Sequence, residues 1–181
     1  MDTIDYWQGL FLIVLIGASA FFSASETALL SLSKIRLKHM VKENVKNAKR
    51  VEKLLDEPNR LIGTILIGNN VVNIGASSIA TALAIKLYPN GGVGIATAIM
   101  TILVLIFGEV TPKNLALQHS EKFSLRITPI IDFLVKLLSP LVFVLTRITN
   151  LIIKILGGKP DDKKPFITEE ELKTLVDVSS K

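Results

Sequence analysis

The chain has 181 residues, of which 49% are hydrophobic, and its mean hydropathy is positive, at +0.48. It contains no cysteine, which excludes a disulfide framework and any metal or redox site built on thiolates. The formal net charge of +5 comes mainly from a basic stretch beside an apolar segment, so it indicates membrane topology rather than nucleic-acid binding. We therefore predict an all-α integral membrane protein whose partners include membrane lipids and no nucleic acid.

Three apolar segments exceed the roughly 20 helical residues that cross a bilayer. They cover residues 6–32, 61–87 and 93–117, and we expect each to be a transmembrane helix. Between the first two, residues 34–60 hold nine Lys or Arg against four Asp or Glu. Basic loops stay in the cytoplasm, so we expect a multi-pass protein of the cell membrane with its N-terminus outside and its C-terminus cytoplasmic. A signal peptide is disfavoured because no basic residue precedes the first apolar segment.

Two further segments are amphipathic. Residues 34–57 carry apolar residues at helical spacing between charges, which predicts one helix on the cytoplasmic surface. Residues 125–156 are apolar but contain three cations on one helical face and two prolines, namely Lys136, Arg147, Lys154, Pro129 and Pro140. The prolines should divide this segment into two short juxtamembrane helices, and the cations should reach lipid phosphates from helices that lie in the interface. A fourth complete span is the alternative.

The composition changes near residue 160. Residues 1–160 are expected to form one transmembrane ion-binding module, and the residues that follow are polar, as in a linker. Thr168 and Glu171 fit a capping box, which predicts that a helix begins there. We therefore interpret residues 161–181 as a linker and the start of a cytoplasmic helix that leads to soluble regulatory domains.

Glu109 is the most informative residue, because it lies within an apolar stretch of the third span. A carboxylate inside a bilayer is costly, so it normally faces the protein interior and marks an ion or proton path. Pro112 has no N–H, so it leaves the carbonyl of Gly108 without its α-helical partner and should kink the helix. A free carbonyl beside a carboxylate offers two hard oxygen donors of the kind that Mg²⁺ or Ca²⁺ prefers.

The other two spans carry polar residues at a similar depth. In the first, Ser19 and Ser23 share a helical face that Glu26 continues. The second has three amides within five residues: Asn69, Asn70 and Asn73. At about 1.5 Å per residue, Ser23, Asn70 and Glu109 all fall in the half of the bilayer nearest the basic loop. These three are therefore predicted cation ligands, whereas Glu26 is either a ligand or a partner of the loop cations.

One carboxylate among neutral oxygens suits a dehydrated hard cation that is held weakly enough to exchange. Mg²⁺ would need a rigid cluster of about six oxygens in octahedral geometry, and Na⁺ would tolerate the same donors. The sequence contains no phosphate-binding loop and no hydrolase or metalloprotease signature, so we expect no enzymatic activity.

Residues 75–82 of the second span are mostly Gly, Ala, Ser and Thr. Small residues let helices approach one another closely in a membrane. This surface is predicted to serve either packing within the subunit or the seam of a dimer.

Three motifs in this order resemble the transmembrane module of the CorC / cyclin M (CNNM) magnesium transporter family: FSASETA at 22–28, GNNVVN at 68–73 and GEVTPK at 108–113. The resemblance covers about residues 5–160. It implies a homodimer with three spanning helices per subunit and a belt of juxtamembrane helices. It also implies that ATP is bound only by CBS domains, which follow the module in longer members and are absent from this sequence.

By resemblance, the module exports Mg²⁺, in exchange for Na⁺, from an intramembrane site. The implied metal ligands are Ser19, Ser23, Asn70, Gly108 through its carbonyl, and Glu109. Second-rank candidates for the ion site are Ser25, Glu26, Asn69 and Asn73. The competing hypothesis is a membrane-embedded Mg²⁺ sensor or anchor, which binds the ion and regulates other transport without moving the ion itself.

Overall fold

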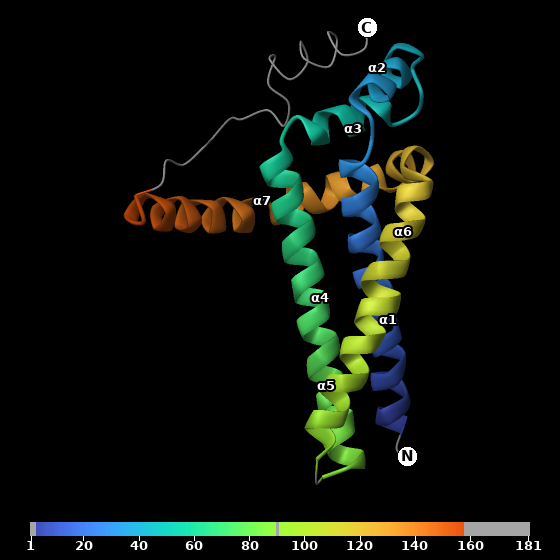
Figure 1. The fold of residues 1–181 in the computed structure, drawn as a ribbon, viewed down its shortest axis with the longest axis vertical. Helices are drawn as coiled ribbons and strands as arrows, with labels where there is room; N and C mark the ends of the chain where they lie inside the picture. The colour runs from blue at the N-terminus through green and yellow to red at the C-terminus, as the bar shows by residue number, and fades with distance from the viewer. Residues whose placement is uncertain (1–2, 90, 158–181) are drawn as a thin grey trace, which may run out of the picture. The chain divides into compact units, whose positions relative to one another are not determined.

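The computed structural model describes residues 3–89 and 91–157, and these residues form only helices and connecting turns (Figure 1). The all-α prediction is confirmed for them. The elements are α1 (Thr3–Leu30), α2 (Lys34–Lys42), α3 (Ala48–Leu55), α4 (Pro58–Leu87), α5 (Gly92–Leu103), the π-helix η1 (Val104–Val110), α6 (Thr111–Gln118) and α7 (Ser120–Ile155). The chain divides into two compact units, Met1–Val142 and Phe143–Lys181. The linker and helix expected at 161–181 lie outside the described residues.

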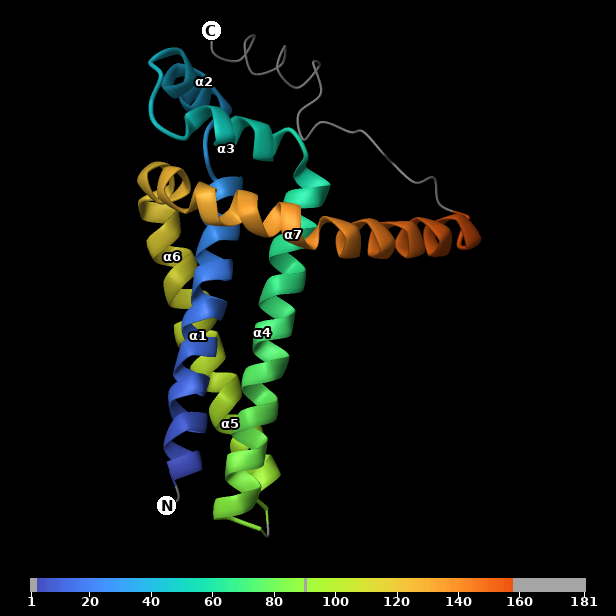
Figure 2. The ribbon, with the colours of Figure 1, turned by 180° about the vertical axis from the view of Figure 1, so that it is seen from behind.

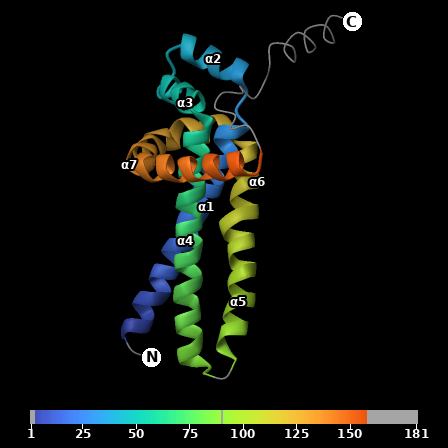
Figure 3. The same cartoon turned by 90° about the vertical axis from the view of Figure 1, so that its left-hand side faces the viewer.

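Three long helical segments of the first unit run side by side: α1, α4, and the succession of α5, η1 and α6 (Figures 1 and 3). Each contains a stretch long and apolar enough to cross a membrane, at Tyr6–Leu30, Pro58–Leu87 and Gly92–Gln118. Ser120–Ile155 meets the same criteria of length and composition. The described part of the chain therefore has four candidate spans, where we predicted three.

The third long segment is not a regular α-helix. Its middle is the π-helix η1, which leads directly into α6, and Pro112 is the second residue of α6. Because proline lacks an N–H, it can bond neither the carbonyl four residues back, at Gly108, nor the one five residues back, at Phe107. A wider turn beside the proline accommodates the missing donor without ending the helix. We predicted a kink at Pro112 but not the π-helical segment.

The single helix predicted for residues 34–57 is wrong, because the structure has two helices there, α2 and α3. The turn between them contains Asn44 and Asn47 with φ angles of 55° and 69°. This left-handed region is strained for most side chains, but asparagine tolerates it. Apolar residues keep their helical spacing across this turn, so the sequence pattern did not reveal that the helix is interrupted. The predicted apolar face is nevertheless buried at Leu37 and Val51.

The division of residues 125–156 by prolines is also wrong, since Pro129 and Pro140 both lie inside α7. A proline inside a helix frees the carbonyl four residues earlier, which for Pro129 is the carbonyl of Leu125. The Nδ2 atom of Asn47 donates a hydrogen bond to that carbonyl at 2.8 Å. The Leu125 carbonyl thus accepts a hydrogen bond from a residue outside α7. This bond offsets part of the free-energy cost of a helix that continues past a proline.

Replacing Asn47 with alanine should therefore destabilise the protein more than replacing Asn44. Both substitutions put alanine in the left-handed region, but only Asn47→Ala leaves the Leu125 carbonyl unpaired, at a cost of about 1–3 kcal/mol. Thermal unfolding of the detergent-purified chain measures the difference, and Asn44→Ala is the matched control for backbone strain. Equal losses of stability in the two variants would contradict a role for the hydrogen bond.

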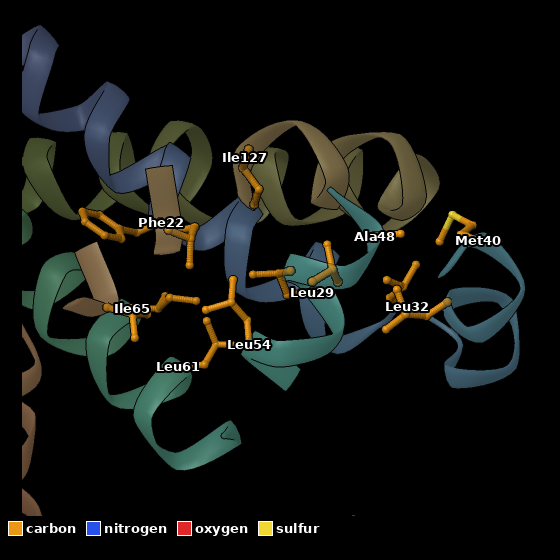
Figure 4. Close-up of a cluster of buried hydrophobic side chains, with 13 residues drawn as sticks. Phe22, Leu29, Leu32, Met40, Ala48, Leu54, Leu61, Ile65 and Ile127 are labelled. Atoms are coloured by element: carbon orange, nitrogen blue, oxygen red, sulfur yellow. The ribbon is translucent and has the colours of Figure 1, made fainter. Parts of the chain in front are cut away.

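The largest buried apolar cluster lies where α1 ends (Figure 4). Its members are Phe22, Leu29, Leu32, Leu37, Met40, Ala48, Val51, Leu54, Leu61, Ile65, Ile127, Ile131 and Val135. The cluster thus ties α2, α3 and the start of α7 to the neighbouring ends of α1 and α4. A second cluster of Ala76, Ala80 and Met100 lies further along α4, where it meets α5. Along α4, the three asparagines at 69, 70 and 73 lie between the residues of these two clusters.

The segment 75–82 has two faces. Ala76 and Ala80 are buried against Met100, so this face serves packing within the subunit, which was one of our two predictions. Ser77 and Ser78 are exposed on the other face.

Up to Val142, α7 runs across α1 and α4 rather than along them (Figure 2). Ile127 and Ile131 pack into the cluster at the end of α1. Further along, Nη2 of Arg60 on α4 donates a hydrogen bond to Oγ of Ser139 at 2.8 Å. This part of α7 is therefore anchored on the ends of two long helices.

Candidate cation site

Three serines of α1 are fully buried: Ser19, Ser23 and Ser25. The Ser25 hydroxyl donates to the carbonyl of Phe21 one turn earlier, at 2.6 Å, which is how a helical serine commonly satisfies itself. The Oγ atom of Ser23 has no hydrogen-bond partner among the described residues. Ser25 is therefore engaged by its own helix, whereas Ser23 is free to contact a ligand.

Ser19 joins three elements. Its hydroxyl donates to Oδ1 of Asn69 on α4 at 3.1 Å. Gly108 of η1 is buried beside it, and a Cβ atom at Gly108 would lie only 2.9 Å from the Ser19 Oγ. Glycine thus lets the η1 backbone approach the hydroxyl where a side chain would not fit. The Ser19 hydroxyl of α1 thus lies close to an amide of α4 and to the backbone of η1. The three residues that we predicted at a similar depth, Ser23, Asn70 and Glu109, lie within one turn of these groups in sequence.

The asparagines of α4 have different surroundings. Asn69 reaches Ser19, whereas Asn70 is exposed in the single subunit. An open groove of about 460 Å³ is lined by Asn70, Asn73, Ile74, Ser77, Ser78 and Thr81. The Oδ1 atom of Asn73 is buried without a hydrogen-bond partner in the described structure. We ranked Asn70 ahead of Asn69, but Asn69 is the amide that contacts Ser19.

Glu109 is half-buried, and its carboxylate forms no hydrogen bond or ion pair with any described residue. Glu26 differs, because its Oε2 lies 3.6 Å from Nζ of Lys113 on α6. The sequence left Glu26 as a ligand or a partner of loop cations, and its partner in the structure is instead a lysine of the third long segment. The spacing of Lys113 one turn after Glu109 was the signal that could have drawn attention to it. Glu109 is thus the carboxylate left free for a cation.

The donors at this level are hydroxyl, amide and carbonyl oxygens together with one carboxylate. Within residues 3–89 and 91–157, no group of three or more His, Cys, Asp or Glu could hold a metal, so a cation here would be held mainly by neutral oxygens. The buried Ser23 Oγ and Asn73 Oδ1 are unpaired, and each such atom costs about 1–3 kcal/mol. Coordination by a hard cation would satisfy them, so this chemistry suits Mg²⁺, Ca²⁺ or Na⁺.

Replacing Pro112 with alanine should weaken cation binding. The new N–H can bond a carbonyl at Gly108 or Phe107, which withdraws an oxygen donor and lets the segment relax towards a regular α-helix. We expect Mg²⁺ affinity to fall roughly tenfold while the helical content stays unchanged. Calorimetry and circular dichroism measure the two quantities, and Pro140→Ala is a control in α7. Unchanged affinity in Pro112→Ala would show that this proline does not shape the site.

Comparison with known proteins identifies the family. Residues 10–181 match the family described as the cyclin M transmembrane N-terminal domain, CNNM. A UPF0053 protein of Haemophilus influenzae is 44% identical over 165 residues, which are 91% of this chain and 39% of that protein. The UPF0053 inner membrane protein YfjD of Escherichia coli is 44% identical over 159 residues, 87% of this chain and 37% of that protein. The polyamine export protein of Escherichia coli is 27% identical over 184 residues, 94% of this chain and 41% of that protein.

The chain spans less than half the length of each of these relatives. The family match nevertheless covers nearly all of it, from the first long helix onwards. One relative is described as an inner membrane protein, and several described helices are apolar and long enough to span. The chain therefore is a multi-pass membrane protein and belongs to the cyclin M (CNNM) transmembrane domain family.

Proposed function

We propose that this protein is a Mg²⁺ transporter of the cell membrane that exports Mg²⁺ in exchange for Na⁺. The proposal depends chiefly on one observation, the unpaired and half-buried carboxylate of Glu109. It is next in sequence to Gly108, which lies beside the Ser19 hydroxyl that is bonded to Asn69. A carboxylate within an apolar helix is costly unless a cation or a proton neutralises it. The resemblance to magnesium transporters supports Mg²⁺ as the cargo.

In this proposal the ion is held by oxygens from three helices. The ligands are Ser19, Ser23, the Gly108 carbonyl, Glu109 and amides from the group Asn69, Asn70 and Asn73. A single carboxylate does not neutralise a divalent ion, so binding is weak and reversible, as a carrier requires. Mg²⁺ demands a more regular geometry than Na⁺, so the same donors can accept Na⁺ on the return path. ATP would act only through CBS domains in a longer chain.

Reconstitution in liposomes tests transport directly. With a Mg²⁺ indicator inside the vesicles, we expect Mg²⁺ flux driven by a Na⁺ gradient, and no flux with Glu109→Gln. Mg²⁺ binding without flux would instead identify a membrane-embedded sensor or anchor. One relative is named a polyamine export protein, so radiolabelled putrescine and spermidine belong in the same assay. Polyamine flux without Mg²⁺ flux would overturn the choice of cargo.

We propose three spans rather than four, with the N-terminus outside and the C-terminus cytoplasmic. Support comes from α7, which runs across α1 and α4 up to Val142. The remaining 13 residues, 143–155, would reach about 20 Å, less than the roughly 30 Å of hydrocarbon that a span must cross. The basic loop after α1 supports the orientation.

Thiol labelling tests this topology, because the chain has no cysteine of its own. A membrane-impermeant reagent should label Tyr88→Cys in intact cells, since the turn between α4 and α5 is assigned to the outside. Lys154→Cys should react only after the cells are permeabilised. Labelling of Lys154→Cys in intact cells would contradict the three-span topology.

A homodimer would cover the polar groove on α4. Asn70, Ser77 and Ser78 are exposed there in the single subunit. The Ser78 hydroxyl donates to the carbonyl of Ile74, but an exposed amide such as that of Asn70 lacks partners when it faces lipid. Small residues also allow close approach of a second helix. Light scattering in detergent tests the dimer, and a mass of one chain per particle would reject it.

A further inference from the structure

We propose that Lys113 is a tethered counter-ion of the cation site, a positioning residue whose ammonium group exchanges between Glu26 and Glu109. The inference rests on the proposed function, because it assumes that Glu109 takes up the transported cation. It deepens that proposal by assigning Glu26 and Lys113 a role that differs from direct ligation.

The observed ion pair bridges two elements of the site. Nζ of Lys113 on α6 lies 3.6 Å from Oε2 of Glu26 on α1, and the two side chains are 42% and 32% exposed. Beside them α1 and α6 pack closely through three buried alanines, Ala24, Ala28 and Ala116. The pair therefore lies at a close contact between α1, which carries Ser23, and α6, which directly follows the η1 residue Glu109.

Lys113 has a second carboxylate within reach along its own chain. Glu109 precedes it by four residues, a spacing that places two side chains on one helical face. Ion pairs at this spacing are more favourable when the acid is N-terminal to the base, as it is here. The π-helix η1 ends at Val110 and α6 begins at the next residue, so the turn that joins Glu109 to Lys113 contains the change from π-helix to α-helix. The four-carbon stem of lysine is flexible and carries a compact charge, so one ammonium can serve either carboxylate. In the structure it is paired with Glu26, and Glu109 is left unpaired.

Charge repulsion makes the two arrangements alternatives. When no cation is bound, the ammonium can move towards Glu109 and neutralise it. When a cation binds at Glu109, the ammonium is repelled and returns to Glu26, because like charges a few ångströms apart interact unfavourably. The observed arrangement is thus the one that is ready to receive a cation. Lys113 would lower cation affinity and favour release, whereas Glu26 would assist binding only by holding Lys113 away.

A double-mutant cycle on the full 181-residue chain in detergent tests this with Mg²⁺ titrations. We expect Lys113→Gln to bind Mg²⁺ about five- to tenfold more tightly than the unchanged protein, because the competing charge is gone. Glu26→Gln should bind about five- to tenfold more weakly, because Lys113 is released towards Glu109. The double variant should match Lys113→Gln, and Lys113→Arg should retain ordinary affinity. A gain of affinity cannot arise from misfolding, so the Lys113→Gln arm remains decisive even if Glu26→Gln folds poorly.

Three outcomes would overturn the inference. Unchanged or weaker binding by Lys113→Gln would exclude a competing charge. An equal loss from Glu26→Gln with and without Lys113→Gln would make Glu26 a direct ligand. Unchanged binding by Glu109→Gln would remove the proposed site itself, and the inference with it. If Glu109→Gln abolishes binding but the effects of Glu26→Gln and Lys113→Gln on the binding free energy are additive, the proposed cation site is supported and only the role of Lys113 is rejected.

Discussion

Glu109→Gln is expected to reduce Mg²⁺ affinity by roughly 100-fold or more, because it removes the charged ligand of the site while keeping the shape of the side chain. The variant should remain folded, since the carboxylate forms no hydrogen bond or ion pair with the residues that the structure describes. Helix stability should be unchanged or improved, because an uncompensated charge is removed from an apolar segment. Calorimetry measures the affinity, and thermal unfolding measures the stability.

Two comparisons sharpen this experiment. Glu43→Gln is a matched control, because the Glu43 side chain is exposed. Its Oε2 atom lies 3.4 Å from Nδ1 of His39, four residues earlier in the chain. It should leave Mg²⁺ affinity unchanged. Asn69→Ala and Asn70→Ala, tested separately, show whether the amide at Ser19 or the exposed amide is the ligand. Full affinity in Glu109→Gln would disprove the site regardless of the asparagine results.

Gly108→Ala is expected to have the second largest effect. Its Cβ atom would lie 2.9 Å from the Oγ and 3.4 Å from the Cβ of Ser19. Ser19 is fully buried, so it can yield only by rotating its hydroxyl away from Asn69 or by separating α1 from η1. Either movement displaces oxygens of the site, so we expect Mg²⁺ affinity to fall at least roughly tenfold and the unfolding temperature to decrease.

Gly17→Ala on α1 is a control for which we expect no clash, because a Cβ atom at Gly17 would meet nothing within 4 Å. Alanine in an open helical position generally stabilises by about 0.5–1 kcal/mol relative to glycine. The control should therefore raise the unfolding temperature slightly and leave binding unchanged. If Gly108→Ala behaved like Gly17→Ala, the close approach of η1 to Ser19 would have no functional meaning.

Features that depend on neighbouring residues in the chain could be predicted from the sequence. The long apolar helices follow from the length and continuity of hydrophobic runs, because a backbone in lipid must satisfy its own hydrogen bonds. From the constant rise of a helix we predicted that Ser23, Asn70 and Glu109 lie at a similar depth. Near them in the structure, Ser19 lies close to both Asn69 and Gly108. Whether these residues bind Mg²⁺ stays a prediction.

Features that depend on contacts between distant residues could not be predicted. The continuity of α7 past Pro129 involves a hydrogen bond from Asn47 to Leu125, 78 positions apart. The pairing of Glu26 with Lys113 joins α1 to α6, so helical spacing could relate Lys113 to Glu109 one turn earlier but could not identify Glu26 as its partner.

The sequence by itself determined that this protein is helical and membrane-spanning, because hydrophobic length and helical periodicity are local properties. Only the tertiary structure decided which amide faces Ser19, since a rotation of α4 by about 100° exchanges Asn69 for Asn70 without altering the sequence pattern. It also decided that Glu109 stays unpaired while Glu26 does not. Side-chain partners across helices depend on the rotation and separation of whole elements, which packing sets and spacing along the chain does not encode.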